Sequence, residues 1–195
     1  MLLTKKELKL IFSDNVSTAV QSVRDRHNLS FEDAMNMIHN EVFQIKPSWI
    51  KRFMEQAKLI ASWSKDPSTK CGAVITDNKC RIVSEGFNGF PQRFPDKPYL
   101  LYNREMKYNL TVHSEINAII FANKPLNDCI IFSWPMIPCC RCAAVICQTG
   151  ISCVIYPELS ADLKERWGKS EKLSKEIFDK CGINHIELPL SIFGE

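Results

Sequence analysis

Two short stretches of the sequence, His113-Ser114-Glu115 and Pro138-Cys139-Cys140-Arg141-Cys142, decide how the rest of the chain is interpreted. Together they supply one histidine and two cysteines that can bind a metal, and one carboxylate that need not bind it. Structural zinc sites are usually closed by four protein ligands, whereas catalytic sites use three and keep one position open. The pattern therefore predicts a catalytic zinc site with His113, Cys139 and Cys142 as its ligands.

Each of these stretches precedes an apolar run of helical length. The first is followed by residues 116–122 and the second by residues 143–147. We therefore expect each set of ligands at the N-terminus of a helix, where the helix dipole favours thiolates and carboxylates. Cys139 and Cys142 are three residues apart, so on a helix they face the same direction and can share one ion.

Each ligand taken singly has a simpler explanation. A lone histidine such as His113 is more often a core or capping residue, and the cysteines alone would suit a structural zinc knuckle. A knuckle needs a fourth ligand. The nearby downstream candidates, Cys181 and His185, lie on a predicted terminal helix and strand. The two stretches taken together favour catalytic zinc.

An HxE followed downstream by PCxxC is the signature of zinc-dependent nucleobase deaminases. In that chemistry zinc lowers the pKa of its water, hydroxide attacks C4 of cytosine, and ammonia leaves. Glu115 is the candidate that takes the proton from water and passes it to the ring nitrogen and the leaving amine. Positioned acid–base catalysis of this kind contributes about 10²–10⁴-fold to a rate.

The composition is that of a globular protein. At 195 residues and 45% hydrophobic content, the chain is long enough for one domain with an extension. Its nine cysteines are an odd number, and three cluster at the predicted metal site, which favours a reducing compartment over a disulfide framework. Cys71, Cys129 and Cys153 lie in apolar runs and are interpreted as core residues.

Charge and hydropathy set the expected partners and location. The formal net charge of +3 is too small to indicate a nucleic-acid-binding protein, but it is compatible with an anionic small molecule. Alternating charges along residues 164–172 are typical of a solvated helix face. Because the sequence has no signal-peptide pattern and no apolar run of membrane-spanning length, we expect a cytoplasmic protein that has no membrane partner.

The chain divides into a helical N-terminal extension over residues 1–46, a domain over residues 47–190 and a tail over residues 191–195. In the extension, Ser30-Phe31-Glu32-Asp33 resembles a capping box before a helix at residues 34–38. In the domain, strands alternate with helices, which indicates an α/β sandwich. The predicted elements are a helix at 48–63, strands at 71–76 and 81–84 joined by a turn at 77–79, strands at 129–134 and 153–156, a helix at 170–181 and a strand at 186–188.

Residues 92–112 are predicted to form a long irregular segment, and such segments are often functional. Four cations in it are candidates to meet a substrate phosphate, although we interpret each singly as a solvated surface residue: Arg93, Lys97, Arg104 and Lys107. Arg141 also puts a cation close to the predicted metal site.

Several stretches of the domain resemble the deoxycytidylate (dCMP) deaminases, within the superfamily of zinc-dependent cytidine deaminases. The resemblance covers about residues 48–188 and rests on these motifs: Lys65-Asp66-Pro67-Ser68-Thr69-Lys70, Gly86-Phe87-Asn88-Gly89-Phe90-Pro91, Lys107-Tyr108, His113-Ser114-Glu115-Ile116-Asn117-Ala118-Ile119, Pro138-Cys139-x-x-Cys142-Ala143 and Gln148-Thr149-Gly150-Ile151.

This resemblance implies a three-layer α/β/α fold around a five-stranded mixed sheet, with zinc on the three predicted ligands and Glu115 as proton shuttle. It also implies that the side chain of Asn88 and the backbone of Ser114 help to hold the pyrimidine and its sugar. The implied reaction is hydrolysis of a cyclic amidine C–N bond, which converts dCMP to dUMP for thymidylate synthesis.

The resemblance further implies a homo-oligomer, commonly a hexamer, under allosteric control. Activation by dCTP with Mg²⁺ and inhibition by dTTP would act through a loop formed by Gly86, Phe87, Asn88 and Gly89. Other functions stay open at this point. They are deamination of another free pyrimidine nucleotide, such as dCTP or a 5-substituted dCMP, deamination of cytidine or adenosine in a nucleic acid, and a non-catalytic regulator that keeps zinc.

Overall fold

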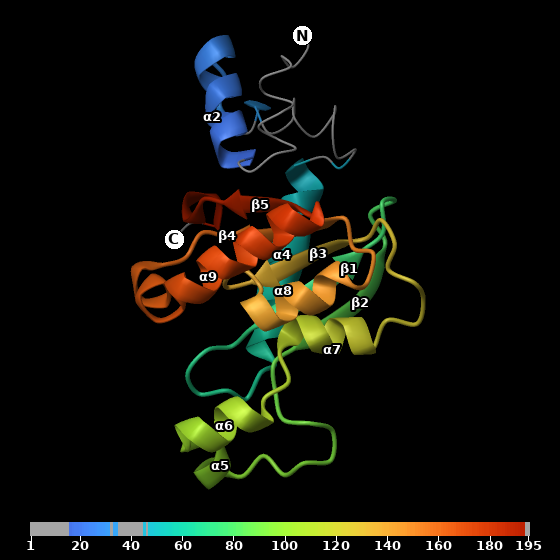
Figure 1. Ribbon diagram of the computed structural model, residues 1–195, viewed down its shortest axis with the longest axis vertical. Helices are drawn as coiled ribbons and strands as arrows, with labels where there is room; N and C mark the ends of the chain where they lie inside the picture. The colour runs from blue at the N-terminus through green and yellow to red at the C-terminus, as the bar shows by residue number, and fades with distance from the viewer. Residues whose placement is uncertain (1–15, 32, 35–44, 46, 194–195) are drawn as a thin grey trace.

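The centre of the protein is a five-stranded mixed sheet, which is seen in a computed structural model that describes residues 16–31, 33–34, 45 and 47–193 (Figure 1). The strand order is β2-β1-β3-β4-β5. β1 is antiparallel to both β2 and β3, while β3, β4 and β5 are parallel. The strands are β1 (Gly72–Thr76), β2 (Ile82–Phe87), β3 (Ile130–Trp134), β4 (Cys153–Pro157) and β5 (Asn184–Leu188).

Helices cover both faces of this sheet, which confirms the predicted three-layer α/β/α fold (Figure 1). Helix α4 packs on one face, and α7, α8 and α9 pack on the other. None of the described helices is long and apolar enough to cross a membrane. The described helices are α2 (Val16–His27), α4 (Pro47–Ser62), α5 (Pro98–Tyr102), α6 (Arg104–Leu110), α7 (Ser114–Ile120), α8 (Cys140–Cys147), α9 (Ala161–Cys181) and a 3₁₀ turn (Leu190–Phe193).

The core lies in two layers because successive side chains of a strand point to opposite faces. In β3, Phe132 packs against Phe53 of α4 with ring centroids 5.1 Å apart. Its neighbour Ile131 belongs to the opposite layer, together with Ile146 of α8. β3 is therefore buried on both faces, which explains its continuous apolar run.

Two glycines let helices approach the hairpin of β1 and β2 closely. A Cβ atom on Gly72 would lie 2.2 Å from the carbonyl oxygen of Ala57 in α4. A Cβ atom on Gly86 would lie 2.4 Å from the carbonyl oxygen of Ser114 in α7. Only glycine leaves room for such contacts, so these positions bring α4 and α7 against the two faces of the sheet.

The structure corrects the predicted course of three segments. Strand β2 continues to Phe87, so two residues of the loop predicted at residues 86–89, Gly86 and Phe87, belong to the strand. The segment predicted as irregular at residues 92–112 contains α5 and α6. Pro98 begins α5, and the side chain of Asn103 caps α6 by accepting a hydrogen bond from Met106 N at 3.1 Å.

Helix α9 is longer than predicted, since it begins at Ala161 and not near Ser170. The first half of the helix has alternating charges and few buried apolar positions, of which Leu163 is one. The sequence therefore shows no clear apolar stripe from which the start of the helix could be predicted. Gly182 follows the helix with φ +70°, as expected for a residue that ends a helix in the left-handed region.

The described part of the N-terminal extension packs against the sheet domain. Val20 and Val23 of α2 belong to the same buried cluster as Ile186 and Leu188 of β5. Ser30 accepts a hydrogen bond from Asp33 N at 3.0 Å, which is the N-cap half of the predicted capping box. Most of the helix predicted after it, residues 35–38, lies outside the described residues.

Candidate zinc site and active-site cavity

The predicted metal ligands lie at two neighbouring helix N-termini. His113 is the N-cap residue of α7, and Cys139 is the N-cap residue of α8. Cys142 follows within the first turn of α8 and is buried. This placement confirms the expected position of the ligands, where the positive end of each helix dipole favours bound anionic groups.

The three ligand atoms form a compact triangle. Cys139 Sγ lies 3.6 Å from Cys142 Sγ and 3.4 Å from His113 Nδ1, and Cys142 Sγ lies 3.3 Å from His113 Nδ1. Ideal Zn–S and Zn–N bonds at a tetrahedral angle would give separations of about 3.8 Å and about 3.6 Å. The donor set and its spacing therefore fit zinc.

The predicted alternatives for a fourth ligand lie elsewhere. Cys181 is exposed at the end of α9. His185 is engaged on β5, where its Nδ1 lies 3.0 Å from the Tyr156 hydroxyl and its Nε2 lies 2.8 Å from Asp179 Oδ1. Within the described residues, His113, Cys139 and Cys142 are the group whose ligand atoms converge as a metal site requires. Three ligands leave a fourth position open.

The electrostatics of the triangle favour a cation between its members. A hydrogen bond from Cys142, together with one from His113, lowers the pKa of Cys139 to about 4, although burial opposes this shift. The pKa of Cys142 moves in the opposite direction, first because it donates to Cys139 and then because it is buried. Two adjacent thiols cannot both ionise without a neighbouring positive charge, and a bound metal supplies that charge.

Glu115 lies beside the triangle in the first turn of α7 and is only 5% exposed. Its Oε2 accepts a hydrogen bond from the Ser114 hydroxyl at 3.1 Å. Its Oε1 lies 3.1 Å from the hydroxyl of Ser133, on β3, which is also 2.9 Å from the carbonyl oxygen of Met136. The single hydroxyl hydrogen of Ser133 can serve only one of these two acceptors at a time.

Ser133 and Met136 are functional neighbours that the sequence analysis missed. The sequence indicates only that Ser133 is a strand residue, and the packing of α7 on the sheet brings it to Glu115, 18 residues away in the sequence. The sequence does contain one weak indication of this role, because Ser133 is a polar residue in the otherwise apolar run of residues 129–134.

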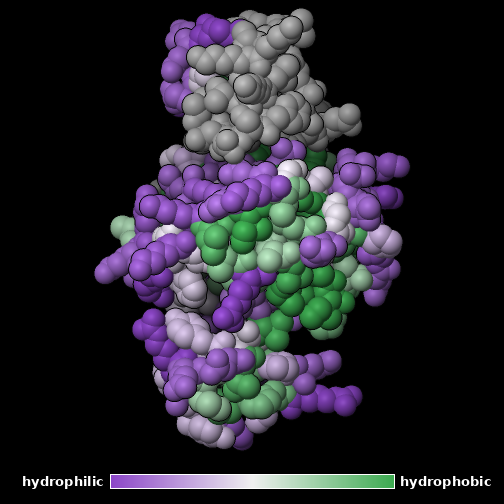
Figure 2. All heavy atoms as spheres, in the orientation of Figure 1, coloured by the Kyte–Doolittle hydropathy of each residue, from purple (hydrophilic) through white to green (hydrophobic). Residues whose placement is uncertain are grey.

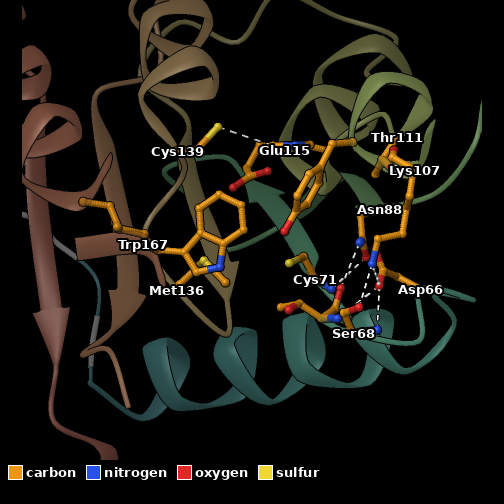
Figure 3. A pocket seen from close by; sticks show the side chains of 14 residues that line it. Asp66, Ser68, Cys71, Asn88, Lys107, Thr111, Glu115, Met136, Cys139 and Trp167 are labelled. Atoms are coloured by element: carbon orange, nitrogen blue, oxygen red, sulfur yellow. Dashed lines mark hydrogen bonds and ion pairs between the residues drawn. The ribbon is translucent and has the colours of Figure 1, made fainter. Parts of the chain in front are cut away.

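A cavity of about 70 Å³ opens in front of Glu115 and the ligand triangle (Figure 3). Glu115 and Cys139 lie on one side of it, and Asn88 and Lys107 lie on the other. Its lining residues are Asp66, Ser68, Thr69, Cys71, Asn88, Lys107, Tyr108, Thr111, His113, Glu115, Met136, Ile137, Cys139 and Trp167.

Asn88, a predicted substrate residue, lines the cavity and also braces its wall. Its side-chain Oδ1 accepts a hydrogen bond from Cys71 N at 2.7 Å, and its Nδ2 donates one to the carbonyl oxygen of Thr69 at 3.0 Å. Ser114, the other predicted substrate residue, is fully buried behind the cavity. The structure therefore brings the amide of Asn88 to the cavity, with one N–H and one lone pair of this amide uncommitted.

Cys71 departs from its interpretation as a core residue. It is half-buried and lines the cavity, whereas Cys129 and Cys153 are buried in the core as predicted. Burial, and then the charge of Glu115, raise the pKa of the Cys71 thiol. Cys71 is therefore a neutral thiol in the cavity wall.

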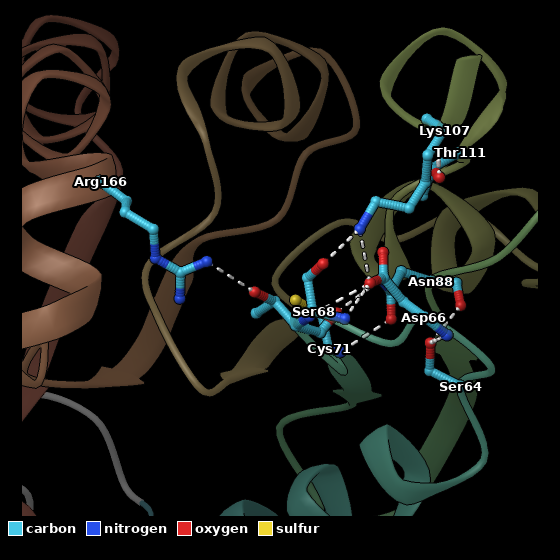
Figure 4. A network of polar contacts seen from close by, with 9 residues as sticks. Ser64, Asp66, Ser68, Cys71, Asn88, Lys107, Thr111 and Arg166 are labelled. Carbon is cyan, nitrogen blue, oxygen red and sulfur yellow. Dashed lines mark hydrogen bonds and ion pairs between the residues drawn. The ribbon is translucent and has the colours of Figure 1, made fainter. Parts of the chain in front are cut away.

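Lys107 also departs from its prediction, because it is 4% exposed and not a solvated surface residue. Its Nζ donates to Asp66 Oδ1 at 2.9 Å and to Ser68 Oγ at 2.7 Å (Figure 4). The same Asp66 oxygen accepts hydrogen bonds from Ser68 N and Thr69 N at 2.7 and 3.1 Å. Asp66 and Lys107 are 41 residues apart, and no local pattern in the sequence pairs them.

Two residues of the predicted effector loop, Gly86 and Phe87, belong to β2, whereas Asn88 lines the cavity. Gly86 packs against α7, and Phe87 is partly exposed with its ring edge-on to Trp63. Gly89 forms an isolated antiparallel bridge with Val112, one residue before His113. This bridge and the Asn88 contacts link the segment to the site.

A second hollow, of about 330 Å³, adjoins the cavity on its outer side. The two share four lining residues: Tyr108, His113, Cys139 and Trp167. The outer hollow is lined in addition by Arg104, Cys140, Arg141, Arg166 and Ser170. Ser170 Oγ accepts a hydrogen bond from Cys140 N at 3.1 Å, which fastens the start of α8 to α9. Of the four cations predicted in residues 92–112, Lys107 lines the inner cavity and Arg104 the outer hollow.

Comparison with known proteins agrees with this geometry. A relative from Aliivibrio fischeri, named "uncharacterized deaminase in luxG 3′ region", is 48% identical over 144 residues, which are 74% of this chain and 96% of that protein. A probable deoxycytidylate deaminase from Drosophila melanogaster is 34% identical over 148 residues, or 70% of each chain. The crystal structure of dCMP deaminase from the cyanophage S-TIM5, in complex with dCMP and dUMP, has the same fold at 20% identity, with a TM-score of 0.58 over 74% of this chain and 99% of that one.

Residues 47–158 match the family described as the cytidine and deoxycytidylate deaminase zinc-binding region. This span contains the three ligand residues, Glu115 and most of the cavity lining. Because the match covers more than half of the chain, and the Aliivibrio fischeri relative is similar along nearly its full length, the protein belongs to the zinc-binding cytidine and deoxycytidylate deaminases.

Proposed function

We propose that this protein is a zinc-dependent enzyme that hydrolyses dCMP to dUMP and ammonia. The observation that carries the proposal is the juxtaposition of three metal ligands with a buried, uncoordinated carboxylate, Glu115, at one cavity. Relatives named deoxycytidylate deaminase, such as the one from Homo sapiens at 36% identity over 115 residues, support dCMP as substrate.

The metal would be held by His113 Nδ1, Cys139 Sγ and Cys142 Sγ, whose spacing fits zinc. Bound zinc lowers the pKa of water toward 7 and so supplies a nucleophile at neutral pH. The contact between Cys140 N and Ser170 Oγ holds the first turn of α8, and with it both cysteine ligands, in place. This contact belongs to the support that catalytic zinc ligands require from their surroundings.

Glu115 would move the protons. Its carboxylate would take one proton from the attacking water and deliver it to N3 of the pyrimidine. Once the oxygen is bonded to C4, the carboxylate would take the second proton from that oxygen and deliver it to the amine, which leaves as ammonia while C4 becomes a carbonyl. The Ser133 hydroxyl suits both states of this carboxylate. It can donate to Oε1 when Glu115 is ionised, and it can turn to the Met136 carbonyl and accept from Glu115 when the carboxyl is protonated.

The cavity walls would hold the base and exclude water. Asn88 offers its uncommitted amide N–H and lone pair to the nucleotide, as the family resemblance implies. Met136, Ile137 and Trp167 supply apolar surface around the reacting ring. Removing water from the site strengthens the electrostatic interactions inside it.

A substrate panel tests the proposal. Ammonia release is measured from dCMP, CMP, dCTP, 5-methyl-dCMP, cytidine and single-stranded DNA, using protein shown to contain zinc. Preferential turnover of dCMP supports the proposed function. Preference for dCTP or 5-methyl-dCMP would instead support deamination of another free nucleotide, and turnover of DNA alone would make the protein a nucleic-acid deaminase.

The product dUMP is a precursor of thymidylate, and we include that metabolic role, in a cytoplasmic setting, in the proposal. All nine cysteines are unpaired, as a reducing compartment requires. Control by dCTP with Mg²⁺ and by dTTP is tested in the same panel by adding each nucleotide where it is not itself a substrate. A change in the rate of dCMP turnover supports a regulatory site at residues 86–89.

We also propose that the protein is a homo-oligomer that assembles through the outer surfaces of α7 and α8. Figure 2 shows hydrophobic side chains gathered over these helices. Ile120 and Phe121 at the end of α7 are 63% and 57% exposed, and Val145 on α8 is also exposed. A contiguous apolar patch of this kind marks an interaction site more often than a free surface. Light scattering of the wild type and of Phe121→Lys measures the assembly directly, and a monomeric wild type would contradict it.

A further inference from the structure

The outer hollow differs sharply from the inner cavity in its charge. Three of its nine lining residues are arginines, namely Arg104 from α6, Arg141 from α8 and Arg166 from α9, and no lining residue is acidic. The three side chains come from separate helices, so no single surface strip explains their convergence. A concave surface of one charge sign attracts ligands of the opposite sign.

Two of these arginines are free of acidic partners. Among the described residues, no ion pair involves Arg104 or Arg141. The guanidinium carbon of Arg104 lies 5.4 Å from the ring centre of Tyr108, which holds the side chain at the wall. Arg166 is neutralised by Asp162 at 2.7 Å and donates to the Thr69 hydroxyl at 3.3 Å. The hollow therefore offers two uncompensated positive charges.

The inner cavity offers no comparable charge. Its one lysine, Lys107, is paired with Asp66 at 2.9 Å and also donates to Ser68. An anion placed there would have to compete with the Asp66 carboxylate for the same ammonium group. A negatively charged part of a ligand is consequently favoured in the outer hollow and disfavoured in the inner cavity.

Two aromatic residues lie where the inner cavity and the outer hollow adjoin. Tyr108 and Trp167 line both of them, and their rings meet edge to face with centroids 6.3 Å apart. The indole Nε1–H of Trp167 is buried and has no hydrogen-bond partner among the described residues.

We propose that the outer hollow binds the 5′-phosphate of the substrate through Arg141 and Arg104, while the base occupies the inner cavity. This assignment rests on the proposed deamination of a nucleotide and specifies its class. A phosphate monoester carries about −1.5 to −2 charges at pH 7, which matches the two uncompensated guanidinium groups. The site therefore selects a nucleoside monophosphate over the uncharged nucleoside. It also selects the monophosphate over a triphosphate, whose negative charge exceeds the two uncompensated positive charges of the outer hollow.

Kinetics of Arg141→Glu test this selection. Charge-assisted hydrogen bonds to phosphate are among the stronger polar contacts, so kcat/KM for dCMP should fall about 10- to 100-fold more than kcat/KM for deoxycytidine, mainly through KM. Arg104→Glu should act in the same direction. Arg52→Glu makes the same charge change on the exposed surface of α4, where Arg52 contacts Trp49, and should leave both substrates unaffected. Equal losses for dCMP and deoxycytidine in Arg141→Glu would overturn the proposal, because the residue would then act on the neighbouring metal ligands.

Titration with inorganic phosphate tests the subsite without turnover. The wild type and Arg52→Glu should bind phosphate alike, and Arg141→Glu should bind it at least about 10-fold more weakly. Equal affinity in Arg141→Glu and the wild type would overturn the subsite. If the wild type deaminates no nucleotide but still binds phosphate through Arg141, the subsite stands and the proposed reaction fails.

Discussion

At the scale of single residues, Glu115 has the contacts that a proton carrier needs. It is buried, it is separate from the ligand triangle, and Ser133 can respond to either of its protonation states. Glu115→Gln should keep one equivalent of zinc and lose about 10²–10⁴-fold in kcat. Zinc content and ammonia release are measured together. Glu55→Gln, the same change on the exposed surface of α4, is the control, and near-normal turnover by Glu115→Gln would rule out the mechanism.

Lys107 provides a second prediction at this scale. Replacing it with methionine leaves the Asp66 carboxylate, whose side chain is 11% exposed, without its cation, and breaking such a largely desolvated pair costs about 3–5 kcal/mol. Lys107→Met should therefore lower the free energy of unfolding by that order, measured by urea denaturation. The double variant Asp66→Asn with Lys107→Met should recover part of the loss, since it removes the uncompensated charge. Additive losses would show that the pair does not stabilise the cavity wall.

The sequence predicted the residues with a chemical signature and missed those that act by position. His113, Cys139, Cys142 and Glu115 form a recognisable pattern because metal ligands and a proton carrier need particular atoms at particular spacings. Lys107 was assigned to the surface, because nothing local indicates a partner 41 residues away. Three more residues of the site are set by the sheet register and by helix packing alone: Ser133, Trp167 and Ser170.

At the scale of elements, the contact between β2 and α7 fixes the helix that carries Glu115. A Cβ atom at Gly86 would lie 2.4 Å from backbone atoms of Ser114 and Ala118, so α7 must shift. Gly86→Ala should destabilise the protein by about 1–3 kcal/mol and lower kcat as well. Gly168→Ala is a matched control in α9, where the nearest atom is 3.8 Å away, and it should stabilise by about 0.5–1 kcal/mol. Unfolding midpoints of both variants measure this, and an unchanged midpoint for Gly86→Ala would refute the close contact.

The turn between β1 and β2 contains Asp77, which should make the free energy of unfolding depend on pH in the acidic range. Burial raises the pKa of Asp77, but hydrogen bonds from Arg81 and Lys79 outweigh it and hold the pKa at about 2, below the unfolded value of 3.8. The ionised carboxylate thus stabilises the fold by about 2 kcal/mol above pH 4. This contribution should decline as the pH falls from about 4 to about 2. The stability difference between the wild type and Asp77→Asn, measured by urea unfolding, should shrink over that range, and a constant difference would contradict the assignment.

Elements with strong periodicity were predicted well, and elements fixed by capping were not. The apolar stripe of α4 and the hairpin of β1 and β2 follow from residue pattern alone. Helices α5 and α6 have five and seven residues, too few to show a period. Their starts depend on Pro98 and on the side-chain cap of Asn103, which are single-residue signals inside a polar stretch.

At the scale of the whole molecule, the site lies where one helical layer meets the sheet. α7 and α8 bring their N-termini together above β3, and α9 covers α8 and closes the outer hollow with Arg166, Trp167 and Ser170. In the proposed enzyme, the inner cavity would supply the metal ligands and the proton carrier, and the outer hollow would supply positive charge. Composition and net charge could not have predicted this division, because the three arginines come from distant parts of the chain and a net charge of +3 does not show where the positive charges lie in the fold.

The proposed deamination of dCMP depends on zinc held by His113, Cys139 and Cys142. The most direct test follows dUMP formation from dCMP by the protein as isolated, after removal of metal with a chelator, and after reloading with zinc. Activity should disappear with the metal and return in proportion to zinc, up to one ion per chain. No dUMP from protein that holds one equivalent of zinc, or undiminished activity after the metal is removed, would contradict the proposal.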